Sequence, residues 1–456
     1  MRRKEGRWPT TDPDMLTQLH LENFKGWEDT GSVRLAPITV LFGSNSSGKT
    51  SLLQSLLLLK QTAESSDRFR VLHTGDERTP VDLGTMSDVV FGHDLARTLK
   101  IGLVWRLPEP LDIPGERLEQ IQFSLEVCTT SEGQPFVRLA RYHMDRSFVA
   151  MERRKDDAGY DLSSHPALKR AKGRPWPLPA PVRFYGFPDE VRSYFQKVDW
   201  LADLALALEK QLARIQYVGP LRYYAHRSYG WSGETPLTVG REGELAVPAL
   251  LAAQAAKRQI GRGEGKGRRY ETFVEAVARW LKELGVIDSF DVVQVSKNRK
   301  DYEVRVRRTS QSAEVLITDV GVGVSQVLPV VVQCFYAAPG STVIFEQPEI
   351  HLHPRVQAAL ADLLVEAATA GGVQFIVESH SEHFLRRLQR RVAEEVISEE
   401  QVALYVCDVA DGKSRLEALK VDTYGNIINW PKDFFGDEIG DLTAMTEAAM
   451  KRRKKR

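Results

Sequence analysis

The sequence predicts an α/β fold organised around a nucleotide-binding loop, and three observations support this prediction. First, residues 37–42 form a short apolar, β-branched run that is typical of a buried strand, and residues 51–60 are rich in helix formers. Second, residues 43–50 lie between them and fit the pattern G-x-x-x-x-G-K-S/T. Third, the apolar runs at residues 341–345 and 373–377 predict two more buried strands, of which the first ends in residues 346–349 and the second runs into residues 378–380.

The loop and the start of the following helix supply the residues that we expect to bind a nucleotide. A strand, a glycine-rich turn and a helix N-terminus together present backbone N–H groups to phosphates. Lys49 is expected to neutralise the β- and γ-phosphates, and the Thr50 hydroxyl to ligate Mg²⁺. The expected nucleotide-binding residues are Gly43, Ser44, Asn45, Ser46, Ser47, Gly48, Lys49, Thr50 and Ser51.

The composition is that of an ordinary globular protein. Hydrophobic residues make up 42% and charged residues 27% of the 456-residue chain, and the formal net charge is +1. Cys128, Cys334 and Cys407 lie far apart, with no spacing typical of a metal site or disulfide. The polar N-terminus and the absence of an apolar window of ~18 residues predict no signal peptide and no membrane span. We therefore expect a cytoplasmic protein.

Chemically useful residues follow the two downstream strands. Glu346 comes directly after the first strand, where a carboxylate opposite Thr50 can serve Mg²⁺ or its water shell. His380 lies just past the end of the second strand, at the edge of the expected site, where it can reach a γ-phosphate.

A second helix N-terminus is predicted upstream of the acidic strand. Residues 319–326 contain two glycines and Ser325, and they lead into an apolar run at residues 327–336 that predicts a helix with Pro329 in its first turn. Glycines and a serine at a helix N-terminus offer a second phosphate-binding end.

The order of these motifs resembles that of ABC-type ATPases. Within that superfamily, Glu346-Gln-Pro-Glu-Ile-His-Leu-His-Pro resembles the chromosome-maintenance and overcoming-lysogenization-defect (OLD) branch. It is similar to stand-alone ATPases of bacterial phage-defence gene sets (Septu- and OLD-like) that lack a nuclease domain. The resemblance covers residues 16–62, 216–244 and 315–440. It implies an ABC-type ATPase head with a mixed sheet that carries the phosphate loop, an antiparallel β-subdomain and a helical lid.

The resemblance also implies roles for single residues, with ATP and Mg²⁺ as cofactors. Glu346 corresponds to the Mg²⁺ carboxylate and His380 to the switch histidine. Gly323, Ser325 and Gln326 correspond to the signature that contacts a partner's γ-phosphate. Because that signature faces the phosphate loop of another subunit, the resemblance implies a homodimer with ATP at the interface.

Two features depart from the family pattern. The family usually has Asp-Glu after the acidic strand, whereas Glu346 is followed by Gln347, and a glutamine cannot accept the proton of an attacking water. Turnover is then expected to be slow, with ATP holding a long-lived dimer, or Glu349 takes the role of the base. No residue stands out as the family's lid glutamine, because Gln61 comes too early, and the turn at residues 82–87 is the alternative.

Two other interpretations compete with this assignment. His351, His353, His380 and His383 could form a metal site, although the first two fit better in a loop that contacts the opposite protomer. Residues 407–412 loosely resemble the paired aspartates of metal-dependent nuclease domains, but a hairpin turn between strands at 402–409 and 415–421 explains them better.

Three runs of basic residues are consistent with nucleic-acid binding. They lie at residues 257–269, 386–391 and 451–456. Phosphate contacts from such runs would be steeply salt-dependent and independent of sequence. Alternatively, the arginines at 386–391 pair with Glu394 and Glu395 at helical spacing.

The predicted domain organisation has six segments. It runs as a disordered N-terminus (1–14), an N-terminal ATPase core segment (15–105), an inserted β-meander and helical segment (106–215), a helical lid and hairpin (216–314), a C-terminal ATPase core segment (315–440), and a final helix with a basic tail (441–456). Within the insertion, residues 153–188 are polar and proline-rich and predict an excursion outside the core.

Two functions are favoured by these observations. The first is a DNA- or phage-responsive ATPase that regulates a separate effector, expected to be a nuclease, in bacterial defence. The second is an ATP-locked scaffold that assembles a partner protein and hardly hydrolyses ATP. A transporter subunit is disfavoured, because such heads are compact and lack a long meander between phosphate loop and signature.

Overall fold

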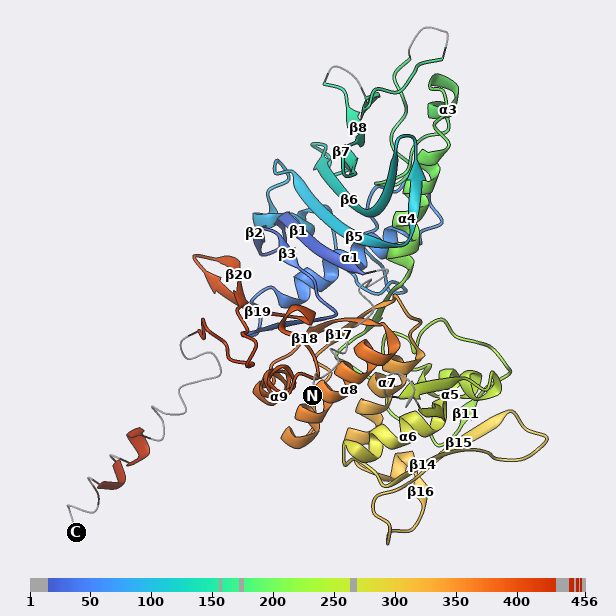
Figure 1. Cartoon of the computed structure of the whole chain (residues 1–456), viewed down its shortest axis with the longest axis vertical. Helices are drawn as coiled ribbons and strands as arrows, with labels where there is room; N and C mark the ends of the chain where they lie inside the picture. The colour runs from blue at the N-terminus through green and yellow to red at the C-terminus, as the bar shows by residue number, and fades with distance from the viewer. Residues whose placement is uncertain are drawn as a thin grey trace, which may run out of the picture.

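The computed structural model describes residues 15–431 except 156–157, 172–175 and 263–268, together with residues 443–446, 448–450 and 452. These residues form an antiparallel sheet and a helical lobe on opposite sides of a central, mostly parallel sheet (Figure 1). The predictions for residues 1–14 and for most of the C-terminal tail fall outside the described residues.

The central sheet carries the phosphate loop. Its strand order is β10-β17-β18-β4-β19-β20, and all neighbours are parallel except β19 and β20. Both faces are buried: Leu41 and Ile344 face one core, and Val40 and Phe345 face the other, which explains the continuous apolar runs. The strands are β4 (Ile38–Gly43), β10 (Ile215–Val218), β17 (Thr342–Glu346), β18 (Gln374–Glu378), β19 (Val402–Ala410) and β20 (Lys413–Leu419).

The antiparallel sheet covers helix α1 (Lys49–Ala63) from the side away from the helical lobe (Figure 1). Leucines of α1 lie in the same hydrophobic core as residues of both sheets. The sheet order is β2-β1-β5-β6-β7-β8-β9, with β3 paired to β1. Its strands are β1 (Leu16–Phe24), β2 (Trp27–Asp29), β3 (Val33–Arg34), β5 (Leu99–Ile113), β6 (Glu116–Thr129), β7 (Pro135–His143), β8 (Phe148–Arg153) and β9 (Tyr160–His165).

The helical lobe packs on the other face of the central sheet. Its core includes buried side chains of α5, α6, α7, α8 and α9. It also contains a small sheet, β11-β15-β14 with β16, and the hairpin β12–β13. The elements are β11 (Tyr229–Gly230), α5 (Ala246–Ala255), β12 (Gln259–Arg262), β13 (Arg269–Thr272), α6 (Phe273–Glu283), β14 (Ser289–Gln294), β15 (Asp301–Arg307), β16 (Val315–Leu316), α7 (Val322–Tyr336), α8 (Pro354–Gly371) and α9 (Glu382–Ala393).

The predicted α/β class with an antiparallel β-subdomain and helices is confirmed. The strands predicted at residues 37–42, 341–345 and 373–377 are also present, as β4, β17 and β18. Helix α4 (Trp200–Ala213) forms within the predicted helical stretch, preceded by the short helix α3 (Glu190–Tyr194). Further short helices of the described residues are α2 (Met86–Val89) and the 3-10 turns η1 (Phe91–His93), η3 (Ile317–Asp319) and η4 (Glu399–Gln401).

Three expectations need correction. Strand β5 crosses the boundary drawn between residues 105 and 106, so the insertion continues the sheet that β1 begins. The described part of residues 153–188 is no excursion, because it adds β9 to the sheet and places Phe184 and Tyr185 in the core. The burial of large aromatic rings outweighs the polar surroundings. Pro329 lies in the interior of α7 rather than in its first turn, because the helix already begins at Val322.

Candidate nucleotide-binding site

The phosphate loop is shaped by two glycines. Gly43, at the end of β4, has φ of 138°, and a Cβ there would lie 2.1 Å from the carbonyl oxygen of Cys407. Gly48 has φ of 97°, and a Cβ there would lie 2.5 Å from Oγ of Ser414. The indole Nε1–H of buried Trp27 donates a hydrogen bond to the Gly48 carbonyl at 3.1 Å. The loop therefore has no room for side chains at the two glycines of its motif.

Lys49 lies against this loop. Its Nζ donates to the carbonyl oxygens of Ser44 at 2.6 Å and Gly43 at 3.0 Å, and its side chain is only 2% exposed. Burial lowers the pKa of Lys49, and the negative charge of Glu378 partly offsets this effect. Among the described residues no side chain caps the N-terminus of α1, so its first N–H groups remain available to an anion.

Glu378 is the carboxylate in contact with the loop, and the sequence interpretation missed it. Thr50 Oγ1 donates to Glu378 Oε2 at 2.7 Å, and Lys49 Nζ lies 3.9 Å from Glu378 Oε1. Glu378 is the last residue of β18, which lies directly beside β4 in the sheet. The signal that selected Glu346, an acid at the end of a buried strand, was equally present at Glu378.

Glu346 lies one strand further from the loop. It is paired in register with Glu378 across β17 and β18, and its Oε1 accepts a hydrogen bond from the Tyr217 hydroxyl at 3.1 Å. Burial, followed by the charge of Glu378, raises the pKa of Glu346 to about 7. The Thr50 hydroxyl and the two carboxylates form a set of oxygen donors, which is the chemistry that Mg²⁺ prefers.

The residues after Glu346 are held in a tight turn. Gln347 has φ of 44°, and its N–H donates to the Glu378 carbonyl at 2.9 Å. Buried Arg222, which the sequence interpretation did not select, donates through Nη2 to the carbonyls of Glu346 and Gln347 at 3.2 and 3.3 Å. Burial lowers the pKa of Arg222 to about 10. The turn thus fixes the backbone of the acidic segment.

A hydrogen bond links the side chain of Glu349 to the backbone of His380. Glu349 is buried, its pKa is raised chiefly by burial, and its Oε1 accepts from the Ser379 hydroxyl at 2.8 Å and the His380 N–H at 2.6 Å. Burial and the nearby charge of Lys49 lower the pKa of the His380 imidazole, and its buried Nε2 has no hydrogen-bond partner among the described residues. His380 therefore lies near Lys49, and its contact with a γ-phosphate stays a prediction.

The residues that correspond to the signature lie at the N-terminus of α7, whereas the phosphate loop precedes α1. Ser325 and Gln326 are buried in the first turns of α7, and Ser325 Oγ donates to the Val322 carbonyl at 2.8 Å. Gly323 is half-buried, whereas Gly321 and Val322 are exposed. Among the contacts of the described residues, none joins Ser325 to the phosphate loop of the same chain.

Gln61 has a structural role. It is buried, its Nε2 donates to the His73 carbonyl, and its Oε1 accepts from the Val81 N–H at 3.3 Å. It therefore holds the segment after α1 against the helix and does not face the nucleotide loop.

The competing metal and nuclease interpretations find no support in the described residues. The group of metal-ligating side chains found there consists of His20, Glu22 and Asp29 on β1 and β2, and it includes none of the four histidines near the acidic strand. Residues 411–412 form the turn of the β19–β20 hairpin, as the alternative to a nuclease site predicted. Cys407 is a buried free thiol.

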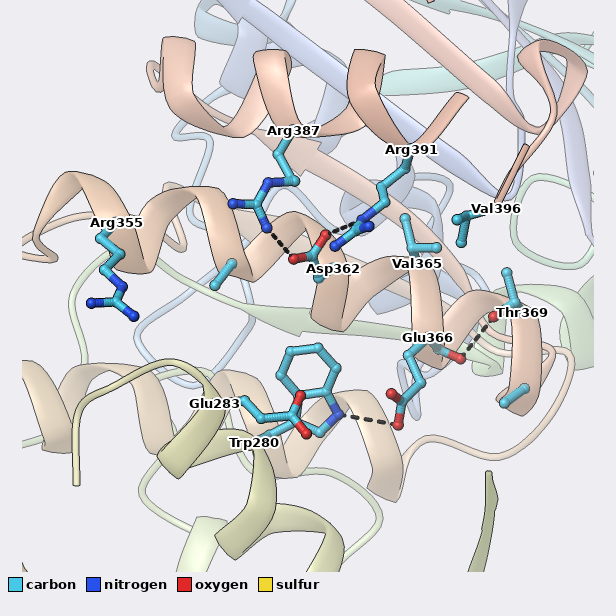
Figure 2. A pocket seen from close by; sticks show the side chains of 12 residues that line it. Trp280, Glu283, Arg355, Asp362, Val365, Glu366, Thr369, Arg387, Arg391 and Val396 are labelled. Carbon is cyan, nitrogen blue, oxygen red and sulfur yellow. Dashed lines mark hydrogen bonds and ion pairs between the residues drawn. The ribbon is translucent and has the colours of Figure 1, made fainter. Parts of the chain in front are cut away.

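The basic run on α9 is largely neutralised. Figure 2 shows Arg387 and Arg391 both reaching Asp362 on α8, at a pocket of about 570 Å³ between α6, α8 and α9. Glu394, one of the two glutamates predicted to pair with these arginines, does form ion pairs with them. Asp362 lies on another helix, so helical spacing could not identify it as a partner. The further pairs on this helix are Arg386 with Glu382, and Arg390 and Arg391 with Glu394.

Three family models match segments of the chain. The model "AAA ATPase domain" matches residues 15–128, "AAA domain, putative AbiEii toxin, Type IV TA system" matches residues 257–386, and "Protein of unknown function (DUF3696)" matches residues 397–445. The first segment holds the phosphate loop, and the second holds the acidic strand and His380. Both halves of the site thus lie in segments that match models of AAA-type ATPase domains, which supports an ATPase of that type.

Among curated proteins, none matches the chain in sequence. Similar solved structures include the SMC head domain from Thermotoga maritima, at 13% identity and a TM-score of 0.40 over 89% of this chain and 99% of that one. The SmcHead bound to the C-winged helix domain of ScpA has 12% identity and a TM-score of 0.44 over 89% and 98%. The Pyrococcus furiosus Smc head bound to the C-terminal domain of ScpA has 11% and 0.42 over 89% and 96%.

Within the described residues, the helices are too short or too polar to cross a membrane.

Proposed function

We propose that this chain binds ATP with Mg²⁺ and hydrolyses it as an ABC-type ATPase head that works as a dimeric nucleotide switch. The observation that carries the proposal is the convergence of a basic, a hydroxyl, two acidic and an imidazole side chain at the carboxyl ends of β4, β17 and β18. This convergence comprises Lys49, Thr50, Glu346, Glu378 and His380.

Each group has a chemical role that follows from its position. On nucleotide binding, the Lys49 ammonium exchanges the carbonyls of Gly43 and Ser44 for phosphate oxygens, and the free N–H groups of α1 hold the phosphate chain. Thr50 and the neighbouring carboxylates would hold Mg²⁺, which neutralises charge on the phosphates. His380, at the edge of the loop, can hydrogen-bond the γ-phosphate or the attacking water.

The dimer component of the proposal rests on the N-terminal end of α7. Gly321 and Val322 are exposed there, and no side chain of the described residues caps the helix start, so its N–H groups can bind an anion. A second copy whose phosphate loop faces this helix end would share its γ-phosphate between protomers. ATP then closes the dimer, and hydrolysis reopens it.

The biological setting is proposed from the sequence resemblance. We infer a DNA-linked ATPase that regulates an effector nuclease in bacterial phage defence. Since the arginines of α9 are mostly paired, DNA contacts are expected instead from the runs at 257–269 and 451–456. Residues 263–268 of the first run, and the second run except residue 452, lie outside the described residues.

A second candidate function follows from Gln347. Its amide follows the acidic strand where the family has a glutamate, and it cannot accept a proton from water. In this alternative the protein binds ATP tightly, hardly turns over and serves as a scaffold for a partner protein.

Steady-state ATP hydrolysis by the purified chain, with and without duplex DNA, tests the proposal. Turnover that Lys49→Ala removes is expected for the switch, and stimulation by DNA supports the DNA link. Tight ATP binding with no turnover, restored by Gln347→Glu, would instead establish the scaffold. Failure of the wild-type chain to bind ATP at all would refute both functions.

A further inference from the structure

A second cavity lies between helix α4 and strand β5, and we call it the α4–β5 cavity. Its volume is about 440 Å³, which is within the range of sites for small molecules. Figure 1 shows α4 beside the hairpin of β5 and β6. The described residues that line the cavity come from β5, from α4 and from the residue directly after α4, and they include none of the nucleotide site.

One wall of the cavity is an irregular stretch of β5. The pairing of β5 with β6 shifts its register between Arg106 and Leu111. Pro108 and Pro110 lie in this interval, and neither has an N–H to donate to a regular ladder. The irregular stretch therefore faces α4 across the cavity instead of continuing the regular pairing.

The two walls are largely apolar. Leu206 on α4 is a large apolar side chain that is nevertheless 44% exposed. Covering such a surface with the apolar part of a ligand is favourable, because apolar area is removed from water. The apolar side chains of the lining are Leu107, Pro108, Pro110, Leu111, Leu206 and Ala207.

Two buried hydrogen-bond donors also belong to the lining. Trp105 is 1% exposed and Gln211 is 3% exposed, and both line the cavity. Among the described residues, neither Nε1 of Trp105 nor Nε2 of Gln211 has a hydrogen-bond partner. Buried polar groups are nearly always hydrogen-bonded, because an unpaired donor is costly. These two donors therefore indicate a ligand that carries an acceptor.

The charged residues of the lining indicate that this acceptor is anionic. Lys210 precedes Gln211 in α4, and Arg214 follows directly after the helix. Two exposed acids, Glu109 and Asp203, line the cavity as well. Asp203 lies about two turns before Gln211 on α4, so the two cations, and not this acid, flank the amide donor. A carboxylate fits this end of α4 better than a neutral or a cationic group.

We propose that the α4–β5 cavity binds a small apolar carboxylic acid. Its carboxylate accepts hydrogen bonds from Trp105 and Gln211 beside the Lys210 ammonium, and its hydrocarbon part covers Leu206. An apolar cavity with a few polar groups that fix the orientation of the ligand is the usual form of a small-molecule site. This inference goes beyond the proposed function and does not depend on it, because the cavity shares no residue with the nucleotide site.

The test is isothermal titration calorimetry of the full chain with octanoate, and with octylamine as a probe of the same length and opposite charge. The wild-type chain should bind octanoate at least tenfold more tightly than octylamine. Gln211→Leu should weaken octanoate binding about tenfold, because one hydrogen bond to a charged group is lost. Leucine leaves no unpaired polar group behind, so this variant is expected to fold.

A filled cavity gives a second test. Ala207→Phe places a ring in the cavity and should abolish octanoate binding. Ala202→Phe is the matched control, because Ala202 is exposed on the same helix outside this cavity, and it should bind like the wild type. Leu206→Asp puts a negative charge on the exposed part of the apolar wall and should weaken binding at least tenfold even if Ala207→Phe does not fold. Thermal melts show which variants are folded.

The inference is overturned if the wild-type chain does not bind octanoate, or if it binds octylamine equally well. In the first case the two donors are served by water only, and in the second the contact is apolar and without a carboxylate site. Wild-type affinity in Gln211→Leu, or in folded Ala207→Phe, would also overturn it, because octanoate would then bind elsewhere.

Discussion

The buried carboxyl of Glu346 makes the stability of the nucleotide-free protein depend on pH. Its pKa is raised from the usual 4.5 to about 7, first by burial and then by the charge of Glu378. The folded chain therefore binds this proton more tightly than the unfolded chain. Stability is highest below the unfolded pKa and falls as the pH rises through the folded value. At about 1.36 kcal/mol per pKa unit, the wild type loses about 3 kcal/mol of unfolding free energy by neutral pH.

Glu346→Gln removes this cost, because the amide carries no charge at any pH. In EDTA, the melting temperature of the wild type should fall between pH 5 and pH 8 by roughly 3 °C more than that of the variant, given a chain of 456 residues. The measurement is differential scanning calorimetry across that range. Glu382→Gln should keep the wild-type slope. An equal slope in Glu346→Gln would show that Glu346 is ionised throughout, and would refute the reasoning.

Two further outcomes are expected. Trp27→Phe keeps a buried ring but loses the hydrogen bond to the Gly48 carbonyl, which contributes about 1 kcal/mol. The ATP affinity, measured by titration calorimetry, should therefore fall about fivefold. Unchanged affinity would mean that the indole does not position the loop. Val322→Glu puts a negative charge at the exposed start of α7, where its side chain is tolerated because Val322 is 48% exposed. The ATP-dependent dimer should then be lost in light scattering while monomeric ATP binding persists, whereas Val322→Ala should still dimerise. A dimer that survives Val322→Glu argues against this interface.

The local features of the site were predictable from the sequence. The strand, the glycine turn and the helix are consecutive in the chain, and each is specified by its own residues, so Lys49 and Thr50 could be assigned without the fold. His380 could be assigned because a residue just past a core strand lies at the edge of the sheet. The hairpin at residues 411–412 follows equally from local turn chemistry.

The arrangement of carboxylates was decided by the tertiary structure. The sequence contains two strands that each end in an acid, but it does not state which strand lies beside β4. The order β17-β18-β4 brings Glu378 against Thr50 and leaves Glu346 one strand away. Strand order depends on long-range packing, so no local pattern encodes it.

The residues that hold the acidic segment and the phosphate loop in place could also be identified only from the tertiary structure. Tyr217 and Arg222 contact the acidic segment from more than a hundred residues earlier, and Trp27 contacts the phosphate loop from a different sheet. Their residue types do not indicate these contacts, because an isolated tyrosine, arginine or tryptophan carries no signal of its partner. The sequence by itself therefore predicted the phosphate loop from consecutive residues, and the packing of three parallel strands decided which carboxylate meets it.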